Sequence, residues 1–305
     1  MISYCFVYGV LAIAGLIGNF MVLLVVIRNN TMRNVTDVLI AHLSLSDTML
    51  IVFSTPALLL QEIGSGSFQP GDIFPKICAG VVIFCSVVSV FTVVTIAIER
   101  YFAIVHPLKQ MTQNKKITVA MSLIVIWSCA LSQLIVRNTV AVFRTKHALL
   151  NETSGGISTA YSRLDDNKHK YYLIAIFLLY NVFPFVLVFY LYTQIIMKLR
   201  SRGKELRETN ATVSQRNESV TKNQRKTIIM LVIVPVVFVV CGWPFTILHL
   251  ILAYMPEVSE VQSVAVKLAD SLLRILAFIP STINPIIYSF FSEKFRAGFR
   301  QLFSK

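Results

Sequence analysis

Long apolar runs recur through almost the whole of this 305-residue sequence. There are seven of them, near residues 4–27, 38–60, 77–105, 117–136, 172–197, 227–254 and 264–291. Each is long enough to cross the roughly 30 Å hydrocarbon core of a bilayer at about 1.5 Å per residue, and none alternates polar and apolar residues as a barrel strand does. Only 14% of the residues are charged, against about 25% in an ordinary soluble domain. The sequence therefore predicts an all-α membrane protein, a single domain over residues 1–305 built as a seven-transmembrane helix bundle.

A short amphipathic segment follows the seventh run. In residues 292–303, SEKFRAGFRQLF, one helical face carries Phe295, Phe299, Leu302 and Phe303, and the basic residues lie elsewhere. A helix divided in this way lies in the plane of a membrane interface with its apolar face toward the acyl chains. We therefore expect a short amphipathic eighth helix on the inner leaflet of the lipid bilayer.

The basic residues are unevenly distributed over the segments between the runs. The chain has 28 Lys and Arg against 15 Asp and Glu, a formal net charge of +13. Most of these bases fall on the cytoplasmic side when the N-terminus is placed outside the cell, which is the orientation that the positive-inside rule selects. The sequence thus predicts a multi-pass plasma-membrane protein with an extracellular N-terminus. Anionic lipids of the inner leaflet account for the positive charge, and no nucleic acid partner is expected.

Polar residues also occur deep inside the apolar runs. Asp47 lies in the second run, Ser89 in the third, and Ser281 and Asn284 in the seventh. If they face a common interior, they offer one carboxylate with hydroxyl and amide oxygens, a set suited to an allosteric sodium ion. The alternative is a hydrogen-bonded structural network without an ion, and the residues alone leave both interpretations open. No other cofactor is expected.

Two segments between the runs are long and polar. The outer one, residues 138–170, contains Asn151-Glu152-Thr153, a sequon that predicts N-glycosylation of Asn151. The inner one, residues 198–226, is basic and rich in Ser, Thr and Asn, which is typical of a mobile loop with charged helix extensions. The five cysteines lie in or beside the runs, and their spacing predicts no disulfide framework.

Motifs within the runs resemble those of the rhodopsin-like (class A) G-protein-coupled receptors, and they follow the family order over essentially the whole chain. The matching residues are Gly18-Asn19, Leu43-Ser44-Leu45-Ser46-Asp47, Glu99-Arg100-Tyr101, Trp127, Pro184 and Tyr192, Cys241 with Pro244, and Asn284-Pro285-Ile286-Ile287-Tyr288. The sixth- and seventh-helix residues look most like those of neuropeptide receptors. The resemblance implies a receptor that promotes nucleotide exchange on a partner and is not itself an enzyme.

The resemblance also implies a role for the charged pair at the inner end of the third run. In this family the acid restrains the arginine until activation, when the sixth helix swings outward and the arginine lines the cleft for a heterotrimeric G protein. By this likeness Glu99 restrains Arg100. The residues implied in G-protein coupling and the activation switch are Glu99, Arg100, Tyr101, Tyr192, Trp243, Pro244, Asn284, Pro285 and Tyr288.

The chain departs from the family pattern in three places. Pro75 stands where members carry a cysteine near the outer end of the third helix, Cys78 lies one turn deeper, and residues 138–170 contain no cysteine. The family disulfide therefore cannot form. Trp243 is displaced by one residue from the family tryptophan, about 100° around a helix. Gln224 replaces the sixth-helix acid that often pairs with the arginine, which predicts a weak inactive-state restraint and appreciable basal signalling.

The outer ends of the runs bear on the ligand. Val82 occupies the position of the acid in amine receptors of the family, and Phe278 that of the retinal-binding lysine in opsins, so the resemblance argues against both classes. Asp270 and Arg274 are four residues apart and either pair with each other or leave Arg274 to bind a ligand carboxylate. The residues predicted for the ligand pocket are Gln61, Val82, Ser86, His249, Asp270 and Arg274, with Glu62, Gln133 and Asn181 as further outer polar candidates. The long outer segment favours a neuropeptide ligand, with a small organic acid or a lipid mediator as the alternative.

Two other function classes have less support. An enzyme needs a nucleophile–base set or a metal-spaced cluster, and the five histidines are scattered along the chain. A transporter favours internal repeats, whereas each motif here occurs once. Arrestin is a further partner by hypothesis, through inner-segment hydroxyl groups at Ser201, Thr209, Thr212, Ser214, Ser219 and Thr221.

Overall fold

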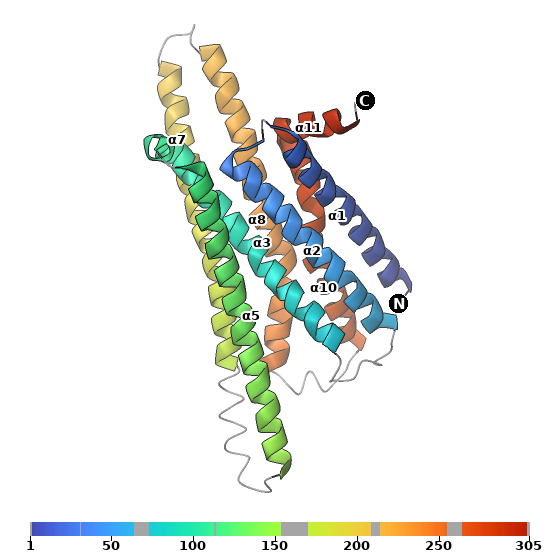
Figure 1. The fold of residues 1–305 in the computed structure, drawn as a ribbon. Coiled ribbons are helices and arrows are strands. Elements are labelled where there is room, and N and C mark those ends of the chain that lie inside the picture. The colour runs from blue at the N-terminus through green and yellow to red at the C-terminus, as the bar shows by residue number, and fades with distance from the viewer. Residues whose placement is uncertain are drawn as a thin grey trace.

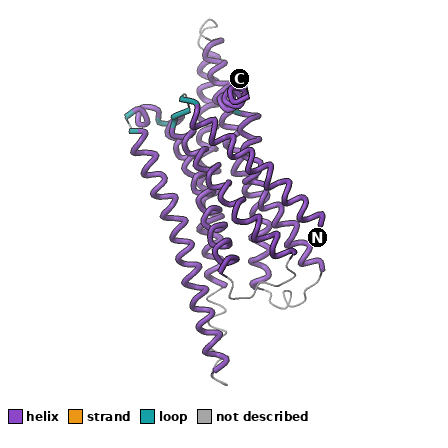
Figure 2. Tube along the Cα trace, turned by 45° about the vertical axis from the view of Figure 1, so that its right-hand side comes forward, coloured by secondary structure: helices purple, strands orange, loops and turns teal. Residues whose placement is uncertain are grey.

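The architecture is a bundle of long helices, seen in a computed structural model that describes residues 2–30, 32–63, 73–112, 114–153, 170–208, 214–254 and 264–303. Within those ranges the chain is helical apart from short connections and contains no strand (Figure 2). The all-α class predicted from the apolar runs is therefore confirmed.

Each predicted span corresponds to a long helical segment (Figure 1). In chain order the elements are α1 (Ile2–Arg28), α2 (Val35–Ile63), α3 (Ile73–Val105), α4 (Pro107–Met111), α5 (Lys115–Thr153), η1 (Leu178–Val182), α7 (Phe183–Glu208), α8 (Ser214–Tyr254), α10 (Val264–Phe291) and α11 (Glu293–Phe303). The fifth span is helical from Lys170 and continues through η1 into α7.

Six of the described segments are long and apolar enough, by length and composition, to cross a membrane. The helix of the seventh predicted span, α10, is outside that group. Its N-terminal half, which is predicted to face the outside of the cell and is called the outer half below, carries Lys267, Asp270 and Arg274. Its C-terminal half, called the inner half, contains Asn284, so α10 is more polar than the other long helices. A bundle partner must cover these groups, because hydrocarbon cannot satisfy them.

Helix α3 occupies the middle of the bundle, as Figure 1 shows. It packs against α2, α5, α7 and α8, while α1 packs against α2 and α10. Buried α3 residues such as Ile96 and Ala97 share the main core with Leu43 of α2 and Val234 of α8. A helix that is apolar on all sides is expected in such a central place.

Two glycines let α1 approach its neighbours closely. A Cβ atom on Gly18 would lie 3.0 Å from the Pro285 side chain of α10, and one on Gly15 would lie 2.7 Å from Ile51 of α2. Glycine is therefore needed here for space rather than for backbone freedom. The contact brings the first- and seventh-helix motif residues together.

The amphipathic helix predicted over residues 292–303 is present as α11, which crosses the inner end of α1 (Figure 1). Its Phe295 is buried, and the ring centroid lies 5.6 Å from that of Tyr288. Gly298 packs so closely on α1 that a Cβ atom there would collide with Val25 Cγ1.

Proline residues interrupt the hydrogen-bond ladders of several spans without ending the helices. Pro56 lies inside α2, and Pro235 and Pro244 lie inside α8. Ahead of Pro184 the chain forms the π-helical turn η1, in which the Phe183 N–H bonds to the Leu178 carbonyl. Because proline has no N–H to donate to the preceding turn, a local change of ladder is expected beside it.

The predictions for the connecting segments have mixed outcomes. The charged helix extensions predicted within the inner segment 198–226 are present, because α7 runs to Glu208 and α8 begins at Ser214, and residues 209–213 lie outside the described ranges. The outer segment 138–170 starts as helix too, because α5 continues to Thr153. The helix α4, between α3 and α5, was not predicted. Polar composition marks where contact with lipid ends, but Lys, Arg, Glu and Gln are good helix formers, so the helices continue into water.

Candidate functional site

A buried polar network lies at the centre of the bundle, where α2, α3 and α10 meet. Asp47 is fully buried. Its carboxylate accepts a hydrogen bond from Asn284 Nδ2 at 2.8 Å and another from Ser89 Oγ at 3.2 Å. The Ser281 side chain is close enough to interact with the Asp47 carboxylate. The structure therefore brings together all four residues predicted for the sodium site.

The network extends to α1 through Asn19, which is also fully buried. Asn19 Nδ2 donates to the Gly15 carbonyl at 3.0 Å and to the Ser281 carbonyl at 2.8 Å. The side-chain amide oxygens (Oδ1) of Asn19 and Asn284 have no hydrogen-bond partner among the described residues. Oxygen atoms of this kind, beside a carboxylate and hydroxyls, form a donor set that suits a hard cation.

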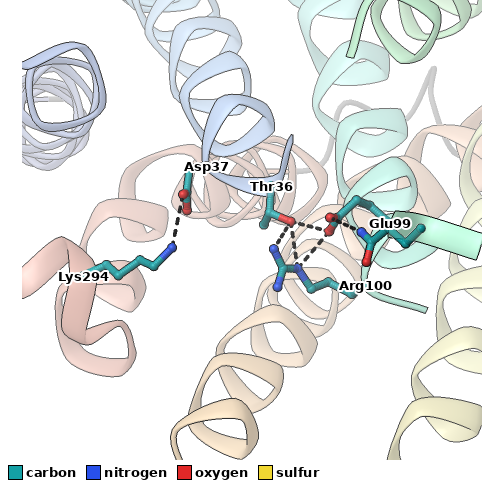
Figure 3. Close-up of polar contacts among 6 residues, drawn as sticks. Thr36, Asp37, Glu99, Arg100 and Lys294 are labelled. Atoms are coloured by element: carbon teal, nitrogen blue, oxygen red, sulfur yellow. Dashed lines mark hydrogen bonds and ion pairs between the residues drawn. The ribbon is translucent and has the colours of Figure 1, made fainter. Parts of the chain in front are cut away.

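Figure 3 shows a second network at the inner ends of α2 and α3. Arg100 Nε lies 2.9 Å from Glu99 Oε2 and donates to Thr36 Oγ1 at 2.7 Å. The Thr36 hydroxyl in turn donates to Glu99 Oε2. Gln110 Nε2 of α4 donates to Glu99 Oε1 at 2.9 Å. Glu99 therefore takes part in contacts to α2, to α4 and to the arginine beside it.

Sequence reasoning did not identify Thr36 and Gln110 as members of this network. Thr36 is the second residue of α2, and Gln110 belongs to the short helix α4, which was not predicted. Neither residue is part of a recognisable motif. Only the close approach of α2 and α4 to the inner end of α3 reveals their role.

Two ion pairs surround this network on the same side of the bundle. Lys294 Nζ lies 3.4 Å from Asp37 Oδ2 and joins α11 to α2 (Figure 3). Lys226 Nζ lies 3.3 Å from Glu293 Oε1 and joins α8 to α11. Gln224, from which a weak inactive-state restraint was predicted, has its side chain outside the described part of the structure. Two positions away, however, Lys226, just before the sixth predicted span, supplies a base that joins α8 to α11.

The two tyrosines implied in activation line a small cavity between the helices. Tyr192 of α7 and Tyr288 of α10 are buried, and the cavity between them has room for about one water molecule. The other lining residues are Leu43, Val93, Ile96, Leu231 and Val234. Both hydroxyl groups lack a hydrogen-bond partner among the described residues. They are therefore available for a polar group that enters the cavity.

The remaining motif residues have mainly packing contacts. Trp243 lies with its ring centroid 5.8 Å from that of Phe177 and 6.0 Å from that of Phe185, so the displaced indole faces η1 and α7. Tyr101 Oη is 3.4 Å from His106 Nε2 at the start of α4. Pro244 lies inside α8, immediately after Trp243.

The fourth-helix tryptophan contacts a residue that sequence reasoning did not select. Trp127 Nε1 donates to His42 Nε2 at 3.1 Å, and His42 Nδ1 lies 3.1 Å from Thr92 Oγ1. His42 thus links α2, α3 and α5. An isolated histidine in an apolar run gives no sequence signal for such a position.

The predicted ligand-pocket residues divide into two groups. Asp270 pairs with Arg274 at 2.5 Å and lies 3.5 Å from His249 Nε2, so the two α10 residues do pair with each other and with α8. Val82 and Ser86 form a separate pair on α3, where the Ser86 hydroxyl donates to the Val82 carbonyl at 2.7 Å.

Two predicted sites rest on side chains outside the described part of the structure. These are the pocket residue Gln61, in the last turn of α2, and the glycosylation residue Asn151, in the last turn of α5. All five cysteines are free, in agreement with the absence of a predicted disulfide framework.

Comparisons with known proteins agree with the order of the motifs. A family model described as 7 transmembrane receptor (rhodopsin family) matches residues 18–288. The chain is 30% identical to neuropeptide FF receptor 1 of Rattus norvegicus, over 97% of this chain and 69% of that protein. It is 26% identical to the allatostatin-A receptor of Bombyx mori, over 97% and 78%. It is 28% identical to the pyroglutamylated RF-amide peptide receptor of Rattus norvegicus, over 93% and 66%.

Proposed function

This chain belongs to the rhodopsin family of 7 transmembrane receptors, and from that premise we propose that it binds an extracellular neuropeptide and activates a heterotrimeric G protein. It acts at the plasma membrane, with its N-terminus outside and α11 on the inner leaflet. Its output is nucleotide exchange on the G protein, with no catalytic step of its own.

The contact between Glu99 and Arg100 is the single observation that carries this proposal. The arginine lies 2.9 Å from Glu99 and donates to Thr36, and it is not among the residues that line the Tyr192–Tyr288 cavity. A charge-assisted pair of this kind is strong where water is scarce. It restrains Arg100 until α8 moves outward, and the unpartnered tyrosine hydroxyls then accept the arginine or a water that it holds.

The peptide class of the ligand is supported by the relatives, whose names refer to neuropeptide FF, allatostatin A and RF-amide peptides. The partly exposed cluster of His249, Asp270 and Arg274 offers charged groups at the outer ends of α8 and α10. Phe245 lies beneath it, 5.5 Å from the Arg274 guanidinium. A peptide can use both the charges and the aromatic face.

The central polar network supports a further part of the proposal, an allosteric sodium ion. Asp47, Ser89, Ser281 and Asn284 would hold it, and the ion would stabilise the arrangement in which α10 is tied to α2 and α3. Replacing NaCl with choline chloride is expected to lower the melting temperature of the wild-type protein and to leave that of Asp47→Asn unchanged. An equal change of melting temperature in the two proteins would contradict the proposed sodium site.

The central experiment measures second-messenger output in cells that express wild type or Arg100→Ala. The cells are tested without stimulus and then with synthetic neuropeptide FF, allatostatin A, neuromedin U and RF-amide peptides. Output that requires Arg100 is expected for at least one peptide. Arg28→Ala is the matched control, because Arg28 is an exposed base at the inner end of α1.

Output that is equal in wild type and Arg100→Ala, with both proteins confirmed at the cell surface, would contradict the proposal. Peptide-independent responses to organic acids or lipid mediators would change the ligand class and keep the receptor. Arrestin recruitment, measured in the same cells after combined substitution of the inner-segment Ser and Thr residues, tests the remaining partner.

A further inference from the structure

The outer half of α5 carries a cation that the signalling mechanism described above does not use. Arg137 continues the inward face of α5, on which Ile126 and Ala130 are fully buried and Gln133 is partly buried. Its guanidinium points to α3, where Nη1 lies 3.5 Å from the Ala79 carbonyl. Among the described residues, no carboxylate forms an ion pair with it.

A guanidinium in this position has unused hydrogen-bonding capacity. Arginine presents five N–H donors in a rigid fork, and the contact to Ala79 is one bond at the long limit of hydrogen-bond geometry. A cation held between helices near the membrane interior is costly unless an anion pairs with it. The fork matches a carboxylate with two parallel bonds.

The surroundings of Arg137 contain other groups that suit an acid. Gln133, one turn deeper on the same partly buried face, carries a side-chain NH2 that can donate to an acid. Its amide oxygen, which has no hydrogen-bond partner among the described residues, is an acceptor for an N–H or hydroxyl of the ligand. Tyr172, at the start of the fifth span, is close enough to interact electrostatically with Arg137. An amide and a phenol can each donate to a carboxylate that the guanidinium holds.

The acid that Arg137 needs is not Asp270. The Asp270 carboxylate already pairs with Arg274 at 2.5 Å and lies 3.5 Å from His249, on α10 rather than beside α5. It is the one acid of the outer half whose side chain the structure describes. An additional carboxylate would therefore complete the α3–α5 side of the pocket.

We propose that Arg137, with Gln133 and Tyr172, forms a subsite that binds a carboxylate of the ligand. On the proposed function of a peptide receptor, which this inference assumes, the carboxylate is an acidic side chain or the C-terminus of the peptide. The ligand thus carries an acid toward α5, whatever group it presents to the cluster on α10.

The test uses the peptide of the synthetic panel that activates the wild-type receptor with the highest potency. Each of its carboxyl groups is converted to the amide in turn, and all forms are assayed on wild type and Arg137→Gln. One conversion is expected to reduce potency on wild type at least about tenfold and to have little effect on Arg137→Gln. The variant itself should lose about the same factor with the parent peptide, while Arg137→Lys should lose less.

Lys267→Gln is the matched control, because Lys267 is an exposed base on the outer half of α10. Unchanged potency of the parent peptide on Arg137→Gln would overturn the proposal. Equal losses for acid and amide forms would also overturn it, since Arg137 would then anchor a lipid headgroup or the bundle itself. The double variant Asp165→Asn, Asp166→Asn is also assayed with the parent peptide. A loss of potency equal to that of Arg137→Gln would overturn the proposal too, because the receptor itself would then supply the acid.

A second measurement needs no agonist and separates this inference from the proposed function. The melting temperatures of purified wild type and Arg137→Gln are compared in sodium acetate and in sodium chloride at equal ionic strength. Acetate is expected to stabilise the wild type more than the variant. Equal shifts would overturn the carboxylate subsite, whereas a panel without any active peptide, beside a wild-type-specific acetate shift, would overturn only the peptide function.

Discussion

The inner and outer halves of the bundle differ in how their polar side chains are held. In the inner half, Asn19 joins α1 to α10, and Asp47 accepts hydrogen bonds from both α3 and α10. In the outer half, Ser86 bonds within its own helix, and Asp270 joins α8 to α10 while remaining 26% exposed. These inner side chains are fully buried where they connect helices, whereas an outer connection such as that of Asp270 remains partly exposed.

On the proposed function, this difference separates the residues of the activation switch from those that would contact the ligand. The inner network ties α2, α3 and α10 together by hydrogen bonds that need no ligand, and its unpartnered atoms are the side-chain oxygens of Asn19 and Asn284. The outer half contains groups such as the Arg137 guanidinium and the Trp243 indole N–H that the described chain does not satisfy. A family can keep the first kind of site constant and vary the second to change its ligand.

The largest effect is expected from removing an inner connection. Asn19→Ala removes the donor to two buried carbonyls and leaves a small cavity, which should destabilise the protein by about 2–4 kcal/mol. The melting temperature of the purified protein measures the loss. Ser128→Ala, which removes a hydroxyl bonded only within α5, should differ little from wild type. Similar losses of melting temperature in the two variants would show that the hydrogen bonds between helices stabilise the protein no more than a bond within one helix.

A smaller effect is expected where α11 meets α1. Gly298→Ala would place a Cβ atom in collision with Val25 Cγ1, and overpacking of this kind costs about 1–3 kcal/mol. The melting temperature should fall in Gly298→Ala and recover when Val25→Ala is added. Gly242→Ala is the control, because no atom lies within 4 Å of the added Cβ. Failure of the second substitution to restore stability would place the strain elsewhere.

The ion pair at the inner end of α8 should have a modest effect on signalling. Lys226 and Glu293 are 44% and 51% exposed, and such pairs contribute about 0–1 kcal/mol, so Lys226→Glu should raise basal output by no more than about fivefold. Adding Glu293→Lys should return it toward the wild-type value. The measurement is unstimulated second-messenger output at equal surface expression. A double variant that is no lower than Lys226→Glu would exclude this pair as a restraint on α8.

The same contrast explains what could be predicted from the sequence. The apolar runs predicted the helices, and motif residues such as Asp47 and Asn284 were predicted to meet, because buried polar groups in a bundle must find one another. Thr36 and Gln110 were missed, since both join the Glu99 network only through the approach of α2 and α4 to α3. Such contacts depend on helix packing, which no local pattern in the sequence encodes.

Helix lengths were the other part that the sequence did not predict. Hydropathy reports contact with lipid, and the predicted span 117–136 ends where polar residues begin. The helix itself continues to Thr153, because the backbone bonds of a helix are satisfied within it and do not depend on lipid. The outer pocket was difficult for a related reason, since Arg137 lies just past the predicted end of that span.

The smallest effect on stability is expected in the outer half. His249→Gln removes a partly exposed ring whose Nε2 lies 3.5 Å from Asp270, while Arg274 keeps its own 2.5 Å contact with that carboxylate. We expect a loss of less than about 0.5 kcal/mol in folded-state stability. The melting temperature should therefore stay close to that of wild type. Peptide potency, measured on the same variant, should change by more than the stability does, because the ring borders the proposed pocket. A large fall in melting temperature would show that the outer half is held together in the same way as the inner half.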